Sequence, residues 1–214
     1  MRHSTGGTLD ATLDLFFDED AETQISKRNL PHWRQEGRLY FVTWRLADSL
    51  PSEKREQLRQ DREDWQRQHG KKDRKNLTLV QRRSYYQLFH QRVQQWLDAG
   101  SGSCILRQEG PLRTMVAALH HFDHERYRLG HFAVAANHVH VLVRPYTGHS
   151  LSGILHSWKS FTAKAINKLL GRSGQLWQDE SYDHLVRSEE ALERIQAYIL
   201  AHRASGGYVE EHGS

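Results

Sequence analysis

Hydrophobic and polar positions alternate most regularly in the middle of the chain. The segments RYRLGHFAVAA (residues 126–136) and HVHVLVRP (residues 138–145) have the alternation typical of strands, and almost nothing separates them. We therefore expect them to pair as an antiparallel hairpin. RLYFVTWRL (residues 38–46) alternates in the same way with good β-forming residues, and another short strand is expected near residues 184–186.

Helical spacing of apolar residues predicts the remaining elements. Residues 151–170 and 189–202 each carry an apolar stripe, and Pro111 begins a shorter helix. Two polar helices are expected at about 52–68 and 78–99. Short antiparallel strands with helices packed on them predict an α+β fold of the ferredoxin-like kind.

The two polar helices form an insertion at about residues 51–99, between the first strand and the rest of the fold. Residues 51–95 carry twelve Lys or Arg against six Asp or Glu, whereas the whole chain has a net charge of only +4. Residues 1–24 are acidic, with a balance of −5. Such asymmetry suggests a polyanionic partner. On charge alone, a solvated pair of helices explains the same excess.

The pair His138-Val139-His140 is the first candidate for chemistry. Alternate side chains of a strand point to the same face, so the two imidazoles lie side by side while Val139 faces the other way. Two neutral imidazoles directed at one point can hold a metal ion. The alternative is that they only form hydrogen bonds on an exposed sheet face.

The surroundings of this pair resemble a known family. VAANHVHVLVRP is similar to the metal-binding strand of the HUH endonucleases, and the wider sequence resembles the REP-associated tyrosine transposases, their single-tyrosine branch. The stretches that carry the resemblance span about residues 25–202: RNLPHW, YFVTWRLADSLP, ANHVHVLV, HSWKSFTAKAINKLLGRSGQLWQDESYDHLVR and ERIQAYIL. The resemblance implies the HUH endonuclease fold, with His138 and His140 as metal ligands.

The resemblance also implies a nucleophile on the last helix. The family's tyrosine segment corresponds to AYILAHRASGG, which makes Tyr198 the nucleophile and leaves Tyr182 as the rival. The family takes a third metal ligand four residues later, here His202, on the same helix face. The family's Asn-Pro is replaced by His202-Arg203. Three nitrogen ligands favour Mn²⁺ over Mg²⁺ as the divalent metal.

The implied function is that of a single-strand DNA endonuclease and strand-transferase, a transposase that acts on hairpin-forming imperfect palindromes through a 5′-phosphotyrosine intermediate. A monomer is expected. Three alternatives stay open: a domesticated protein that binds DNA hairpins without cutting them, a zinc hydrolase using three histidines, and an RNA-binding module on the sheet face.

Basic side chains on two helical regions are candidates for DNA contacts. Solvent-exposed positions on the helices would explain these basic side chains equally well. They are Lys159, Lys164, Lys168 and Arg172 on and after the helix that follows the hairpin, and Arg82 and Arg83 in the insertion.

Three segments are expected along the 214 residues. Residues 1–26 form a flexible acidic segment, residues 27–204 a single catalytic domain, and residues 205–214 a C-terminal tail. No apolar run reaches the roughly 20 residues that cross a bilayer, and MRHSTGGTLD lacks the apolar stretch of a signal peptide. The single cysteine, Cys104, excludes an intrachain disulfide. A cytoplasmic protein without membrane contact is expected.

Overall fold

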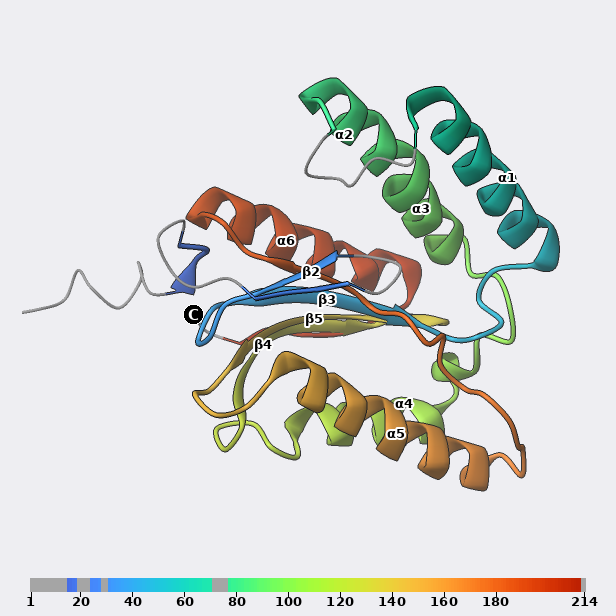
Figure 1. Ribbon diagram of the computed structural model, residues 1–214. Coiled ribbons are helices and arrows are strands. Elements are labelled where there is room, and N and C mark those ends of the chain that lie inside the picture. Colours follow the sequence, from blue (N-terminus) through green and yellow to red (C-terminus); the bar gives the residue numbers. More distant parts are fainter. Residues whose placement is uncertain (1–14, 19–23, 28–30, 71–76, 213–214) are drawn as a thin grey trace, which may run out of the picture.

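A five-stranded antiparallel sheet is the centre of the computed structural model, which describes residues 15–18, 24–27, 31–70 and 77–212 (Figure 1). Its strand order is β6-β3-β5-β4-β7. The strands are β3 (Tyr40–Arg45), β4 (Tyr127–Val134), β5 (His138–Pro145), β6 (Tyr182–Leu185) and β7 (Tyr208–Glu210). If β3, β4, β5 and β6 are numbered 1 to 4 in chain order, their order in the sheet is 4-1-3-2, as in a ferredoxin-like sheet.

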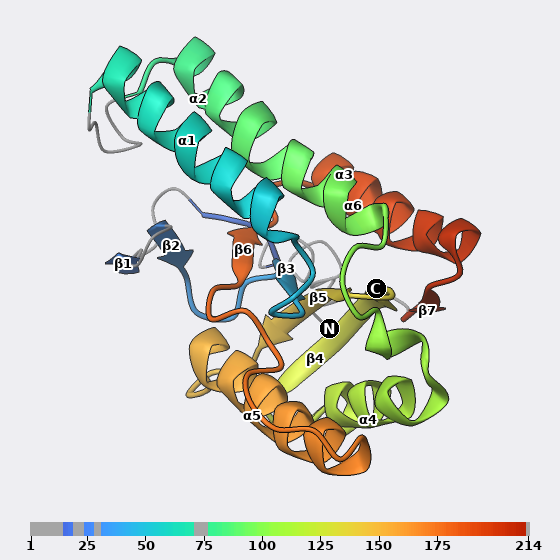
Figure 2. The same cartoon turned by 90° about the vertical axis from the view of Figure 1, so that its right-hand side faces the viewer.

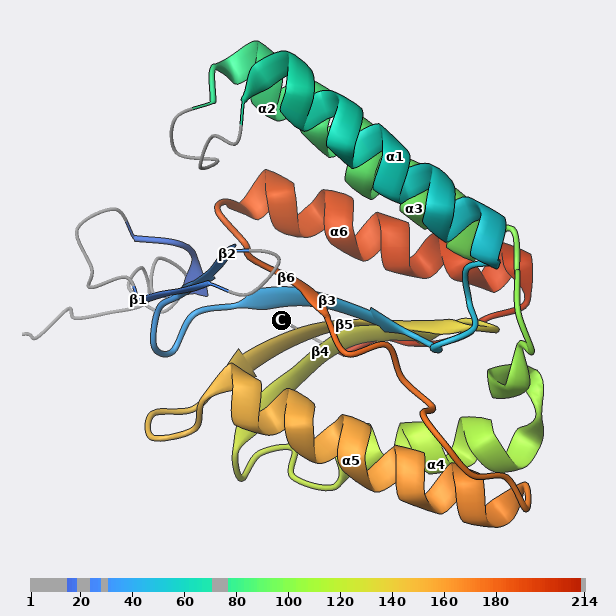
Figure 3. The same cartoon turned by 45° about the vertical axis from the view of Figure 1, so that its right-hand side comes forward.

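Helices cover both faces of this sheet. α4 (Glu109–His120) and α5 (Leu151–Leu169) lie on one face, and α6 (Glu189–Ala201) lies on the other (Figures 1 and 3). Because side chains alternate along β5, Val139, Val141 and Val143 join the core under α4 and α5. The residues between them face α6. This sheet order and these layers confirm the predicted α+β fold, a ferredoxin-like antiparallel sheet with helices packed on it.

The predicted insertion is a helical arm. We use this name for α1 (Ser52–His69), α2 (Leu79–Tyr86), the π-helical turn η3 (Gln87–Gln91) and α3 (Arg92–Asp98). The arm lies on the same side of the sheet as α6, and α3 runs close to α6 (Figures 2 and 3). Its own small core is made by Trp65, Leu77 and Phe89, and Arg92 forms an ion pair of 2.5 Å with Asp61. The helix expected at 78–99 is therefore interrupted by a π-helical turn.

Some elements were not expected from the sequence. β1 (Gln24–Lys27) and β2 (Pro31–Arg34) pair antiparallel outside the main sheet. β7 lies in the segment set apart as a C-terminal tail and pairs with β4. Residues 15–18 run along the sheet, where Phe17 N donates to Val186 O. The rest of the acidic segment up to residue 23 lies outside the described residues, and the proposed domain boundaries remain predictions.

No helix in the described part of the chain has the length and apolar character needed to cross a membrane.

Candidate metal centre and tyrosine

The histidine pair lies on the central strand, under α6. His138 and His140 are 1% and 0% exposed, so they are not surface residues of an open sheet. Their rings contact each other at 4.6 Å between centroids. The strand periodicity thus places both imidazoles on one face, as predicted, and α6 with the end of the arm covers them.

Hydrogen bonds on the far side of each ring fix how the imidazoles are oriented. Asn137 Nδ2 donates to Ser101 O at 2.7 Å, so its side-chain oxygen is turned to His138, whose Nδ1 donates to it at 2.7 Å. His140 Nδ1 lies 2.7 Å from the Thr43 hydroxyl. The proton on His138 Nδ1 leaves the Nε2 lone pair of that ring for a metal ion, and the Thr43 contact fixes the orientation of the His140 ring.

His202 completes a triangle of imidazoles. It follows the last residue of α6, and its Nδ1 donates to the Tyr198 carbonyl at 3.0 Å. Its Nε2 lies 3.4 Å from His138 Nε2. Nitrogen ligands at about 2.1 Å from a tetrahedral metal ion are themselves about 3.4 Å apart. The separation of the two nitrogens therefore suits a shared ion.

A fourth group comes from the helical arm. Asp98, the last residue of α3, places Oδ1 3.5 Å from His138 Nε2 and 3.4 Å from His202 Nε2. One ligand atom from each of Asp98, His138, His140 and His202 lies within 4.8 Å of the others. Asp98 was not predicted from the sequence. Its position just before the Ala99-Gly100 helix end carries no signal of a metal ligand.

The charges of these groups fit a cation. Burial lowers the pKa of His138 to about 3, with the neighbouring His202 acting in the same direction. Burial also holds the pKa of His140 well below its usual range. Burial acts to lower the pKa of His202 as well, but the hydrogen bond and charge of Asp98 raise it overall. The two strand imidazoles are neutral at pH 7, as metal-binding imidazoles must be, and they face the carboxylate of Asp98.

Tyr198 lies directly beside this cluster. Its hydroxyl is 3.2 Å from His140 Nε2 and donates to Gln94 Oε1 at 3.4 Å. Its ring packs edge-on against Phe41 and His202. The i, i+4 spacing of Tyr198 and His202 delivers both from one helix, as predicted. Gln94, like Asp98, comes from α3.

The rival tyrosine lies farther away. Tyr182 is opposite Thr43 on β6, and Thr43 is in turn opposite His140. Tyr182 is thus two strands from the histidine pair, about 9–10 Å at the usual strand spacing. The geometry brings Tyr198, and not Tyr182, to the cluster.

The candidate DNA-contacting residues on and after α5 do not gather at this site. Lys159, Lys164 and Lys168 lie on α5, across the sheet from the histidines, and Arg172 follows that helix. Lys159 Nζ donates to the carbonyls of Gln178 and Asp179. The side chains of Arg82 and Arg83 lie outside the described residues. A role for these six in DNA binding remains a prediction.

The first helix of the arm does not contribute to the net positive charge of the insertion. α1 carries five Lys or Arg and five Asp or Glu, so it is neutral overall. Arg59 pairs with Glu56 and Glu63 on its own surface. The excess of the insertion therefore lies after α1.

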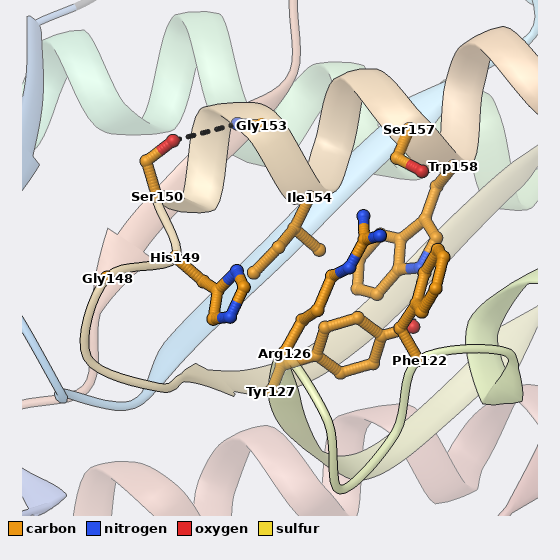
Figure 4. A pocket seen from close by; sticks show the side chains of 10 residues that line it. All are labelled: Phe122, Arg126, Tyr127, Gly148, His149, Ser150, Gly153, Ile154, Ser157 and Trp158. Carbon is orange, nitrogen blue, oxygen red and sulfur yellow. Dashed lines mark hydrogen bonds between the residues drawn. The ribbon is translucent and has the colours of Figure 1, made fainter.

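A cavity of about 250 Å³ lies on the other side of the sheet, at the start of α5 (Figure 4). Tyr127, Ile154 and Trp158 line it, and Arg126 stacks on Phe122 at its rim. Tyr127 and Trp158 belong to the core under α4 and α5. The cavity is therefore separate from the histidine cluster.

The sequence model of a family described as "Transposase IS200 like" matches residues 111–202. The matched segment contains the histidine pair, Tyr198 and His202. The resemblance inferred from the sequence is thereby confirmed. Asp98 and Gln94 lie outside the match.

Among solved structures, the chain is similar to one described as "Structure of the REP associates tyrosine transposase bound to a REP hairpin". The identity is 12% and the TM-score 0.42, over 83% of this chain and 74% of that chain. At this low similarity, the sheet order and the helix layers define the fold, and the neighbour does not. A comparison with curated proteins found no match.

Proposed function

We propose that the protein is a metal-dependent single-strand DNA endonuclease and strand-transferase, with Tyr198 as the nucleophile. The observation that carries the proposal is the 3.2 Å distance between the Tyr198 hydroxyl and His140 Nε2, within the cluster of three imidazoles and one carboxylate. The match of residues 111–202 to the family model described as "Transposase IS200 like" supports it.

His138, His140, His202 and Asp98 are the residues that would hold a divalent metal ion. When bound, the ion supplies Lewis-acid polarisation of a non-bridging phosphate oxygen. Three nitrogens and one carboxylate oxygen favour Mn²⁺ over Mg²⁺, which prefers oxygen ligands. Asn137 holds His138 in the tautomer that this role requires, and Thr43 holds the orientation of His140.

Tyr198 would carry out the covalent step. Its hydroxyl oxygen forms a bond to the scissile phosphorus and loses its proton, and the bond from phosphorus to the 3′ oxygen breaks. The leaving 3′ oxygen takes up a proton and becomes a hydroxyl, and the 5′ phosphate remains on the tyrosine. The phosphodiester count is unchanged, so a later 3′-hydroxyl can reverse the step without ATP.

α6 positions this nucleophile. Phe41 and His202 pack against the Tyr198 ring, and Gln94 accepts a hydrogen bond from the hydroxyl. A phenol is a poor nucleophile at its ordinary pKa near 10, so it needs a positive charge close to its oxygen. A cation held by the cluster of ligands would supply that charge next to the hydroxyl. The substrate that we propose is single-stranded DNA with imperfect palindromes, bound by a monomer.

The test is formation of a covalent adduct. Purified protein is incubated with single-stranded hairpin oligonucleotides and Mn²⁺, then separated on a denaturing gel. Wild type and Tyr182→Phe should give a protein–DNA adduct, and Tyr198→Phe should give none. His138→Ala/His140→Ala should also give none.

Other outcomes decide between the remaining functions. Hairpin binding without an adduct in Mn²⁺, Mg²⁺ or Zn²⁺ would indicate a binding protein that does not cut. Cleavage that persists in Tyr198→Phe would indicate a hydrolase that uses the three histidines without a covalent intermediate. Equal adduct yield in Mg²⁺ alone would contradict the preference for Mn²⁺.

A further inference from the structure

A second group of imidazole and carboxylate side chains lies at the β7 edge of the sheet. His120 ends α4, Glu210 ends β7, and His212 lies two residues after Glu210. Glu210 is opposite Phe132, whose side chain belongs to the core under α4 and α5. The group is therefore on the opposite face of the sheet from Tyr198.

Both imidazoles approach the same carboxylate oxygen. Nε2 of His120 lies 2.9 Å from Glu210 Oε1, and Nε2 of His212 lies 3.0 Å from it. These three ligand atoms are all within 4.8 Å of one another. Donor atoms of a zinc site are spaced by about 3.3 Å, so the two distances to Glu210 Oε1 are within a few tenths of an ångström of the spacing that an ion needs.

Neighbouring side chains hold the three groups in place. The Phe132 ring contacts both imidazoles, at 5.7 Å from His120 and 5.9 Å from His212. The Tyr208 hydroxyl donates to the other carboxylate oxygen of Glu210 at 3.0 Å. Oε1 is thus the oxygen left for the imidazoles. Support of this kind behind the ligands is typical of metal sites.

The nitrogen of His212 is the most informative atom. Nε2 is shielded from solvent and has no hydrogen-bond partner, although Glu210 Oε1 is only 3.0 Å away. The distance suits an ion pair, but the direction does not suit a hydrogen bond. Buried polar atoms without a partner are uncommon. A hydrogen bond would need an N–H of His212 directed at Glu210 Oε1. Coordination of a cation shared with Glu210 instead needs the Nε2 lone pair directed to one side of that oxygen.

We propose that His120, Glu210 and His212 form a structural site for a divalent cation of the zinc type. Two imidazoles and one carboxylate are ligands that Zn²⁺ accepts, with water in a fourth position. The ion joins the end of α4 to the end of β7, two elements that are far apart in the sequence. The inference does not depend on the proposed DNA chemistry.

A cation at this site would stabilise the position of β7, which follows His202 in the chain. η5 (His202–Ser205) leads directly to β7, and Gly207 N donates to His202 O at 2.9 Å. β7 itself is only three residues long. A cation at its end opposes the fraying that such a short edge strand otherwise shows. It thereby holds the backbone at the C-terminal end of α6.

The experiment measures Zn²⁺ binding to the full chain, with Zn²⁺ alone as the probe. Competition with a chromogenic chelator gives the number of ions per chain. Wild type should bind two, one at each cluster. His120→Gln/His212→Gln should lose one, and so should His138→Ala/His140→Ala. The matched control His121→Gln/His149→Gln changes two exposed histidines and should keep both ions.

Amide exchange gives a readout that does not depend on stoichiometry. At a Zn²⁺ concentration of 100 times the dissociation constant, local opening of β7 should become about a hundredfold rarer in wild type and in the control. His120→Gln/His212→Gln should show no slowing at Val209. Retention of two ions by that variant, or zinc-independent exchange of β7 in wild type, would overturn the proposal. The DNA adduct assay is separate, so either proposal can fail alone.

Discussion

The carboxylate of Asp98 lies 3.4 Å from Nε2 of His202, although the two residues belong to the helical arm and to the end of α6. The same carboxylate is 3.5 Å from His138 on the central strand. Three separate parts of the chain therefore meet at one point. Asp98 is also 40% exposed in its side chain, so it is the solvent-facing member of a cluster whose imidazoles are buried.

Replacing Asp98 by Asn should weaken metal binding while the fold is retained. The substitution removes the negative charge and keeps the shape of the side chain. We expect the Mn²⁺ affinity to fall roughly tenfold or more, by analogy with changes around metal ligands. Isothermal titration with Mn²⁺ measures it. Asp64→Asn, on the outer surface of α1, is the control and should not change the affinity.

Thr43→Val should show whether Thr43 affects metal binding through His140 or affects only the stability of the fold. The variant loses the hydroxyl that lies 2.7 Å from His140 Nδ1. We expect a roughly 10–100-fold loss of metal affinity. Thr162→Val removes a buried hydroxyl that accepts from Trp177 Nε1 on the other side of the sheet. It should cost about 1–3 kcal/mol of stability and leave metal affinity unchanged. Equal affinities in both variants would contradict the role of Thr43.

Acid should destabilise the metal-free protein through buried histidines. Burial lowers the pKa of His184 to about 4, and its Nδ1 is buried without a hydrogen-bond partner. The unfolded chain binds the proton near pH 6.5 and the folded chain does not, so stability is full above pH 6.5 and falls as the pH drops toward 4. Urea unfolding in EDTA between pH 7.5 and 4.5 measures this loss.

His184→Gln tests the share of this one residue. The glutamine does not titrate, so the loss of unfolding free energy between pH 7.5 and 4.5 should be smaller by about 2 kcal/mol than in wild type. His138 also titrates in the metal-free protein, with a pKa lowered to about 3, so some pH dependence remains. An identical pH dependence in the variant and in wild type would show that His184 does not contribute.

Gly130→Ala should destabilise the sheet. Gly130 lies where the register of β4 against β5 shifts, and an added Cβ would be 2.9 Å from Leu142 Cβ and 3.2 Å from Leu142 O. Neither atom can move without shifting β5. We expect a loss of about 1–3 kcal/mol in urea unfolding. A change below about 0.5 kcal/mol would mean that the two strands separate easily here.

The centre of the fold was predictable because its patterns are local. Alternation along β5 and apolar stripes on α5 and α6 fixed which side chains share a face, and hence the histidine pair and the spacing of Tyr198 and His202. The very short strands were missed. QISK and YVE contain too few residues to show an alternation, and their pairing depends on contacts elsewhere in the chain.

The arm shows why Gln94 and Asp98 were not predicted from the sequence. A π-helical turn acts as an extra residue in an α-helix and rotates the residues after it by about 100°. Because η3 precedes α3, the face on which Gln94 and Asp98 lie cannot be read from a regular helical period. Their contacts with Tyr198 and His202 arise only when the arm packs beside α6.

The segment that the family match recognises is not the smallest unit that could work. A protein shortened to residues 111–202 would keep the histidines and the tyrosine, but it would lack β3, which supplies Thr43 and lies inside the sheet. It would also lack Ser101, whose carbonyl orients Asn137, together with Gln94 and Asp98. The segment that the family model matches is therefore shorter than the segment that supplies all the residues around the histidines and the tyrosine. Transplanting this centre into another scaffold requires the sheet and the arm together.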